Sequence, residues 1–145
     1  MTSPHEAAIL ALQASIDAHA ATVIRESDFP EVCPAAGLIN LVPMDPEEQA
    51  VRLGVGVSEW QRVVELETIV QAATEPARSA ALDTALAALA SLLAADCTLS
   101  GAVDWLVMGA PQQSDAVPMQ GAETLKGAVL PVTLFYETTT ANPME

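Results

Sequence analysis

The sequence predicts an α+β fold, a small mixed, mostly antiparallel sheet with two main helices on one face, in the order α-β-β-α-β-β. Three observations predict it. A capped helical pattern opens the chain, an alternating strand pattern runs over 60–71, and an Ala/Leu helical pattern turns into a strand within "LLAADCTLSGAVDWLVMGAP". The 145 residues suit one domain, expected over 1–145 with a polar tail at about 139–145.

The first helix is predicted from Pro4 to about Ala21. Ser3 can cap it, Pro4 suits the first helical position, and Glu6 completes a capping box. Apolar residues then follow near helical spacing at Ile9, Leu12, Ile16 and Val23. His5, in the first turn, is expected to be exposed, and the stretch from Arg25 to Gly37 is expected to be a connector.

Two strands are predicted before the second helix. "LINLVP" over 38–43 suits a short buried strand, and the stretch that follows it suits a loop or hairpin. Gly54-Val55-Gly56 in that stretch lacks the Lys-Ser/Thr of a phosphate loop. Over 60–71, apolar residues favour the even positions and polar ones the odd positions, which predicts a sheet open on one face.

The second helix is predicted to begin at Thr74-Glu75-Pro76 and to run to about Ala95. Its apolar stripe consists of Leu82, Leu86, Leu89 and Leu93. Alanines cover most of the remaining surface, so another backbone can approach closely. That backbone can belong to the first helix or to a neighbouring subunit, and the sequence leaves both open.

The turn after the second helix has its own chemistry. Asp96 is unfavourable at the negative end of a helix dipole, but its side chain can bond turn backbone groups, as can those of Thr98 and Ser100. Leu99 is expected to enter the core, and Gly101 permits backbone angles that other residues resist. A strand is expected next, with Val103, Trp105 and Val107 on one face.

A loop over 109–124 and a final strand over 125–140 complete the chain. A structureless loop of that length is uncommon in a compact domain and is usually functional or disordered. In the last strand, Pro131 predicts a sheet edge or a bulge, because proline cannot donate a ladder hydrogen bond. The residues expected to face the core are Leu130, Val132, Leu134 and Tyr136, and the tail after them is expected to be loose.

Nineteen acidic residues face five basic ones, for a formal charge of −14. This charge argues against ordinary nucleic-acid binding and against docking on an anionic membrane. No apolar run approaches the ~18 residues of a membrane span, and the N-terminus lacks the basic start of a secretory signal. Cys33 and Cys97 are expected to be buried and reduced, and neither they nor His5 and His19 form a metal motif. No cofactor or metal is expected.

The second half of the chain resembles the tail-terminator (tail-completion) proteins of long-tailed phages and gene-transfer particles. "ALDTALAALASLLAADCTLSGAVDWLVMGAP", then an acidic polar loop, then "GAVLPVTLFYETTTANP" carry the resemblance, most clearly over 78–143. In that family a helix closes with a D-x-T-L-x-G turn and the last strand ends in Y-x-T; the family's frequent Gly-Gly is Ser100-Gly101 here. The matching motif residues are Asp96, Thr98, Leu99, Gly101, Tyr136 and Thr138.

The resemblance implies a virion protein, made in the host cytoplasm, that acts without an active site. Such proteins form a hexameric ring at the head-proximal end of the tail tube. The ring stops addition of the major tail tube protein and meets the head–tail connector or stopper protein. DNA would cross its lumen without specific binding, which suits an acidic ring.

Four residues are predicted to contribute to contacts between ring subunits. In so acidic a chain, each cation is a candidate partner for a neighbour's carboxylate, and pairing within the subunit is the alternative. Charge reversal at Arg62 should weaken the ring, and an unchanged hexamer by light scattering would refute that role. The four candidates are Arg52, Arg62, Lys126 and Trp60.

Other interpretations remain open at this stage. One is another head–tail connector, a stopper or a tail chaperone, and another is a plain soluble interaction domain. A third is a small acidic enzyme using Glu65, Glu67 and Asp104, which requires a concave pocket with perturbed carboxylates. Glu65 and Glu67 would project from one face, roughly 6.6–6.8 Å apart, but few aromatic residues are available to bind a sugar and a solvated sheet face is the simpler interpretation of the pair.

Overall fold

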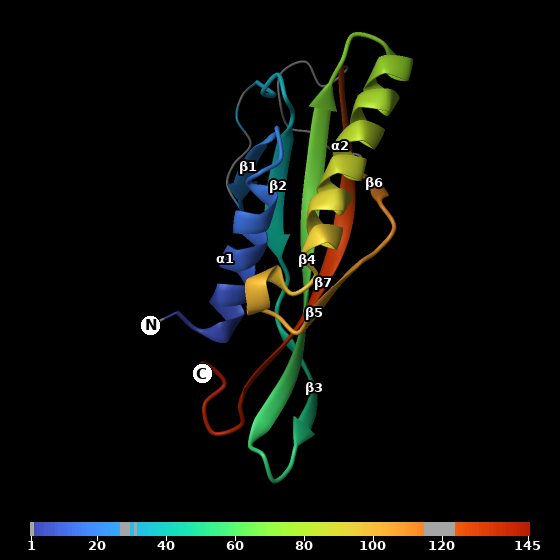
Figure 1. The fold of residues 1–145 in the computed structure, drawn as a ribbon. Coiled ribbons are helices and arrows are strands. Elements are labelled where there is room, and N and C mark those ends of the chain that lie inside the picture. The colour runs from blue at the N-terminus through green and yellow to red at the C-terminus, as the bar shows by residue number, and fades with distance from the viewer. Residues whose placement is uncertain (1, 27–29, 31, 115–123) are drawn as a thin grey trace.

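A computed structural model describes residues 2–26, 30, 32–114 and 124–145. Both long helices lie on the same face of one sheet (Figure 1), so the predicted α+β architecture is confirmed. The elements are α1 (Pro4–Ile16), β1 (Thr22–Arg25), β2 (Leu38–Pro43), β3 (Glu47–Arg52), β4 (Val57–Gln71), α2 (Glu75–Ala95), the 3-10 helix η1 (Leu99–Gly101), β5 (Trp105–Met108), β6 (Gln112–Ser114) and β7 (Leu125–Thr139).

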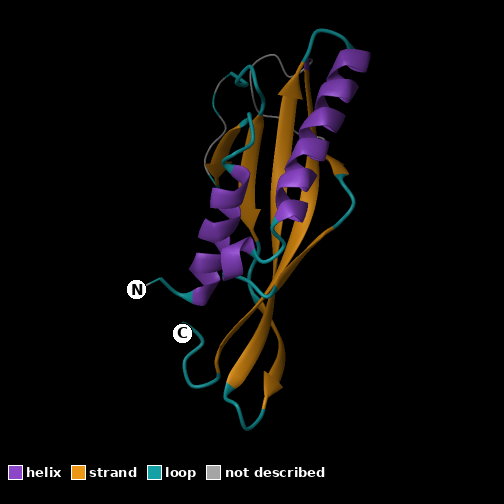
Figure 2. Ribbon diagram, viewed as in Figure 1, coloured by secondary structure: helices purple, strands orange, loops and turns teal. Residues whose placement is uncertain are grey.

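The sheet has seven strands, with β1-β2-β4-β7-β5 as its main order (Figure 2). β3 adds to β4, and β6 adds to β7. β1 and β2 pair in parallel and the other described pairs are antiparallel. β4 and β7 form the longest strand pair of the sheet, because their ladder runs without a break from the pair Val57–Thr139 to the pair Gln71–Leu125.

The main core lies between this sheet and the two helices, and a smaller buried cluster around Leu38, Ile69 and Cys33 lies on the opposite face. As the alternation predicts, even-numbered side chains of β4 and β7 face the helices, where they meet the leucine stripe of α2 and the apolar face of α1. The fully buried residues of this cluster include Ile9, Leu12, Ile16, Ile39, Leu41, Val64, Leu66, Leu89, Leu93, Val132 and Leu134.

The first helix ends at Ile16, and the prediction that it continues to about Ala21 is wrong. The N–H groups of Asp17 and His19 already bond back to Gln13 and Ile16 as the helix closes. The His19 ring then holds the turn, because its Nδ1 accepts the Ala21 N–H at 3.0 Å. The residues after the turn form β1, a strand that the sequence did not predict between the first helix and the connector.

The stretch predicted as a loop over 109–124 contains the short strand β6, which pairs with β7. Three polar residues give no strand pattern, so the sequence did not reveal it. The part of the predicted loop over 115–123 lies outside the described residues.

β7 lies inside the sheet, so Pro131 does not mark an edge strand, and the register of β7 with β4 passes through Pro131 without a shift. On its other side the predicted irregularity is present, because the register with β7 shifts by one residue between Met108–Val132 on β5 and Gln112–Val129 on β6. Proline is tolerated there because its nitrogen side faces the interval between β5 and β6. Across that interval the Pro131 carbonyl accepts the Gly109 N–H at 2.8 Å. A Cβ on Gly109 would lie 2.8 Å from the proline ring, so this close approach needs glycine.

The stretch after β2 forms a hairpin, as one of the two predicted options required. β3 pairs with the first residues of β4, and the connecting loop of Leu53–Gly56 holds two glycines at positive φ. In Figure 1 this hairpin projects beyond the part of the sheet that the helices cover. The sequence predicts the hairpin but not its projection, which follows from the length of β4.

α2 begins where predicted, with the Thr74 hydroxyl accepting the Ala77 N–H at 3.3 Å. Leu82, Leu89 and Leu93 are buried and Leu86 is half-buried. By length and composition α2 could also span a membrane, with a mean hydropathy of 1.3, although it packs on the sheet here. Only 17% of that apolar window is buried, so the alanine surface of α2 is largely uncovered in a single copy.

Candidate interaction surfaces

The joint between α2 and β5 is held by the Asp96 carboxylate. One of its oxygens accepts the Ser100 N–H at 2.9 Å and the Ser100 hydroxyl at 3.2 Å, and the other accepts the Thr98 hydroxyl at 3.3 Å. Leu99 enters the core, and its φ of 49° is followed by 58° at Ser100 and 90° at Gly101. Three successive residues at positive φ reverse the chain tightly, so this motif sets the direction in which β5 leaves.

The end of β7 closes on the start of α1. The His5 ring donates from Nε2 to the Pro143 carbonyl at 2.8 Å, so Nδ1 is free to accept the Tyr136 hydroxyl at 2.7 Å. Trp60 packs edge-on against His5, with ring centroids 4.9 Å apart, and its indole N–H donates to the Thr138 hydroxyl at 2.8 Å. Both residues of the Y-x-T motif therefore bind other elements of the fold.

Two predictions about these ends are wrong. His5 is not simply exposed, since it bonds Tyr136 and Pro143, which lie more than a hundred residues away. The tail is not loose either, because the Thr139 N–H bonds the Glu145 carbonyl at 2.7 Å. Burial raises the pKa of Tyr136, with the nearby Arg62 charge opposing it, and favours the neutral hydroxyl that donates to His5.

The structure places the four predicted ring-contact residues in bonds within one chain. Arg62 donates to the backbone carbonyls of Met44 at 2.7 Å and His5 at 3.2 Å. Lys126 pairs with the Glu75 carboxylate at 2.6 Å, and Trp60 belongs to the His5 cluster described above. Their role between subunits stays a prediction.

Arg52 differs from the other three because its side chain is about half exposed. It pairs with Glu137 at the end of β7 and with Glu59 at 3.4 Å on β4. Arg52 is the last residue of β3, so these pairs hold the loop end of the projecting hairpin against the end of β7.

Around β5, the described residues leave the face of the sheet opposite the helices uncovered, whereas near β2 the same face holds a buried cluster of Leu38, Ile69, Leu125 and Cys33. On β5, Leu106 is buried while Trp105 is 53% exposed and Val107 is exposed too. Trp105 stands beside the half-buried Phe135 of β7 as its direct cross-strand partner. Val103 lies in the core instead, so its predicted place on the Trp105 face is wrong.

Glu65 and Glu67 lie on this same open face, both half-buried. Burial raises the pKa of Glu67, and the negative charge of Glu65 raises it further. The two carboxylates stand on a broad sheet surface beside Val42 and Asn40, their cross-strand neighbours on β2. Asp104, the third carboxylate of the enzyme hypothesis, is exposed at the start of β5.

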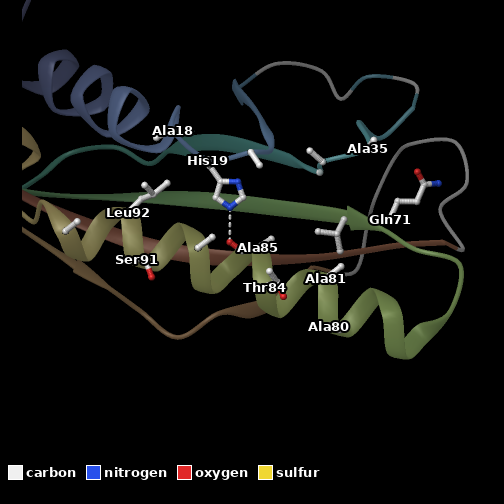
Figure 3. Close-up of a pocket in the computed structure, with 16 residues that line it drawn as sticks. Ala18, His19, Ala35, Gln71, Ala80, Ala81, Thr84, Ala85, Ser91 and Leu92 are labelled. Carbon is white, nitrogen blue, oxygen red and sulfur yellow. Dashed lines mark hydrogen bonds between the residues drawn. The ribbon is translucent and has the colours of Figure 1, made fainter.

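A groove of about 770 Å³ lies between α2, the turn after α1 and the stretch before β2 (Figure 3). Alanines form most of its wall. The sequence predicted the alanine surface of α2 but not the groove. His19 crosses one side of the groove, donating from Nε2 to the Ala85 carbonyl at 3.0 Å. His19 is the only titratable side chain among the described residues that line it.

The described residues contain no group of three or more His, Cys, Asp or Glu side chains that could hold a metal ion. Cys33 is buried and Cys97 is half-buried, and both are free thiols. Burial raises the pKa of the Cys33 thiol, which makes it less reactive.

No family model matches the chain, and no curated protein does either. Among solved structures, the fold is similar to a chain described as "Virion of native gene transfer agent (GTA) particle". The two share 14% sequence identity over 94% of this chain and 92% of the other, with a TM-score of 0.38. A likeness this distant does not bear on what the chain does.

Proposed function

We propose that this chain is a structural protein of a phage-like particle. In the proposal it forms a six-membered ring on the head-proximal end of the tail tube, ends addition of tube subunits and joins the tail to the head connector. The resemblance of the D-x-T-L-x-G joint and the Y-x-T strand end to tail-terminator proteins suggests this role.

The observation that carries the proposal is the amount of apolar surface that one copy leaves uncovered. Trp105 and Val107 on the open sheet face, Leu53 and Val55 on the projecting hairpin, and the alanine face of α2 are all exposed. Contiguous exposed apolar surface is typical of protein–protein interaction sites. A ring subunit needs them, because it meets two neighbouring copies and a different partner at each end.

The chemistry of the motif residues supports a structural role. Asp96, Thr98 and Leu99 hold the joint, while Tyr136 and Thr138 fasten the end of β7. The polar side chains among them are hydrogen-bonded within the fold and Leu99 is buried. These residues therefore hold the backbone around them in a fixed shape.

The charge supports a ring through which DNA passes. Six copies of a chain with a net charge of −14 would carry about −84, which disfavours adhesion of DNA to the ring. A measured positive potential along the lumen would contradict this part of the proposal.

Deleting the chain from a particle-producing strain is the functional test. We expect tails of uncontrolled length that fail to join heads, and restoration of one defined length when the chain is supplied again. Tails of normal length joined to heads in the deletion strain would refute the proposal. Tails of normal length without heads would favour another connector or stopper component instead.

A further inference from the structure

The projecting hairpin ends in an apolar tip, defined here as Leu53–Val57. Leu53 is 91% exposed and Val55 is 67% exposed. The tip is held in place from behind, because the Gly56 carbonyl accepts the Thr140 N–H at 2.9 Å and Arg52 is paired with Glu59 and Glu137. A fixed, solvent-exposed apolar projection loses little conformational freedom on binding, which favours a docking role.

The groove beside α2 offers a matching surface on the other part of the molecule. Its volume of about 770 Å³ falls within the range of pockets that bury drug-sized ligands. The short alanine side chains along α2 let another backbone approach closely. In Figure 1, α2 lies toward one end of the molecule and the hairpin forms the other end, so a single copy cannot bring the two together.

Electrostatics favours these two surfaces for contact between copies. Two chains that each carry −14 repel one another over most of their surfaces. The tip contains no charged residue, and α2 contains none from Thr84 to Ala95. Tip and groove can therefore meet without bringing carboxylates together, whereas the open sheet face carries Glu65 and Glu67.

We propose that the hairpin tip of one copy inserts into the α2 groove of a second copy, so that copies of the chain join head to tail. The inference rests on the proposed function, in which copies associate, and adds the surfaces that they use. Because tip and groove are different surfaces at different ends, the contact is heterologous. Such contacts close into rings when the rotation between copies allows it.

Cysteine cross-linking tests the contact. In the background Cys33→Ala and Cys97→Ala, one chain carries both Leu53→Cys and Ala88→Cys, one at the tip and one in the groove. We expect mild oxidation to give a disulfide-linked ladder beyond the dimer, because each copy links to the next. A mixture of the two single-cysteine variants should give dimers only. Pairing Leu53→Cys with Ala94→Cys, exposed on α2 outside the groove, should give no ladder.

A second variant measures the strength of the contact. Leu53→Ser should weaken association about tenfold or more, since it removes one large apolar side chain from the interface. Leu10→Ser, which also removes an exposed leucine but from α1, should leave association unchanged. Thermal unfolding of Leu53→Ser should match the parent because Leu53 is 91% exposed, whereas Leu10→Ser should lower Tm slightly because Leu10 is 46% exposed and serine is the weaker helix former.

The outcomes separate this inference from the proposed function. Assembly seen by light scattering without any tip-to-groove ladder would overturn the inference and leave the ring standing. Disulfide-linked dimers without higher species from the double variant would also overturn it, because they indicate a closed two-fold pair. A groove cysteine that links only to subunits of added tail tubes, and not to a second copy of this chain, would also overturn the inference. A chain that stays monomeric even with tail tubes would overturn both proposals.

Discussion

Replacing Tyr136 with Phe removes one hydroxyl from the cluster that joins the two ends of the chain. That hydroxyl donates to Nδ1 of His5 at 2.7 Å, and the rest of the Tyr136 side chain is buried against the core. Phenylalanine keeps the ring and its packing. The substitution therefore isolates one hydrogen bond between the end of β7 and the start of α1.

The expected loss is about 1 kcal/mol. A neutral hydrogen bond contributes about 0.5–1.5 kcal/mol net, and His5 is only half-buried, so water can satisfy Nδ1 after the change. For a domain of this size, 1 kcal/mol corresponds to about 2–4 °C in Tm. His5→Ala should cost more, about 2–3 kcal/mol, because it also removes the Pro143 bond and two edge-to-face contacts.

Thermal unfolding followed by circular dichroism can test this as a double-mutant cycle. If Tyr136 and His5 interact as described, the double variant should lose about 1 kcal/mol less than the sum of the single losses. Thr74→Ala, which removes the hydroxyl that caps α2 and shares no hydrogen-bond partner with His5, is the control and should be additive with His5→Ala. Additivity of Tyr136→Phe and His5→Ala within about 0.3–0.5 kcal/mol would refute the reasoning.

Three further substitutions address the joint, the open face and its carboxylates. Leu99→Ala should cost about 2–5 kcal/mol in denaturant unfolding because Leu99 fills the core, whereas Leu10→Ala on the exposed side of α1 should cost far less; equal losses would contradict that placement. Glu67→Gln should raise Tm at neutral pH and make Tm less dependent on pH. Because the pKa of Glu67 is raised in the folded protein, its carboxylate lowers stability as pH rises from the unfolded pKa through the folded pKa. An unchanged dependence of Tm on pH would contradict this. Trp105→Ser should cost the monomer up to about 1 kcal/mol through loss of the cross-strand contact with Phe135, and it should weaken assembly measured by light scattering; undiminished assembly would remove the open face from the proposal.

The elements that the sequence predicts well are those with a long, regular pattern or a strong local signal. The alternating pattern over 60–71 identifies most of β4, β7 alternates along most of its length, and α2 starts at a capping threonine with proline in its first turn. Local chemistry also defines the joint, where Asp96 and Gly101 act within a few residues of their own positions. In these places the physical cause and the residues that carry it are close together in the sequence.

The features that the sequence does not reveal depend on distant contacts. The end of α1 depends on the His19 ring, which also reaches the Ala85 carbonyl on α2. Pro131 fits an interior strand because β5 and β6 leave an interval opposite it. The role of His5 depends on a partner 131 residues away, and the groove depends on how far apart the two helices come to rest on the sheet.

The number and position of copies in an assembled particle test the central claim most directly. Electron cryomicroscopy of tails, with the chain located by a label on its C-terminus, would measure both. The proposal predicts one ring of six copies at the head-proximal end of each tube and none along the tube. A single copy per particle, or copies spread along the tube, would contradict it.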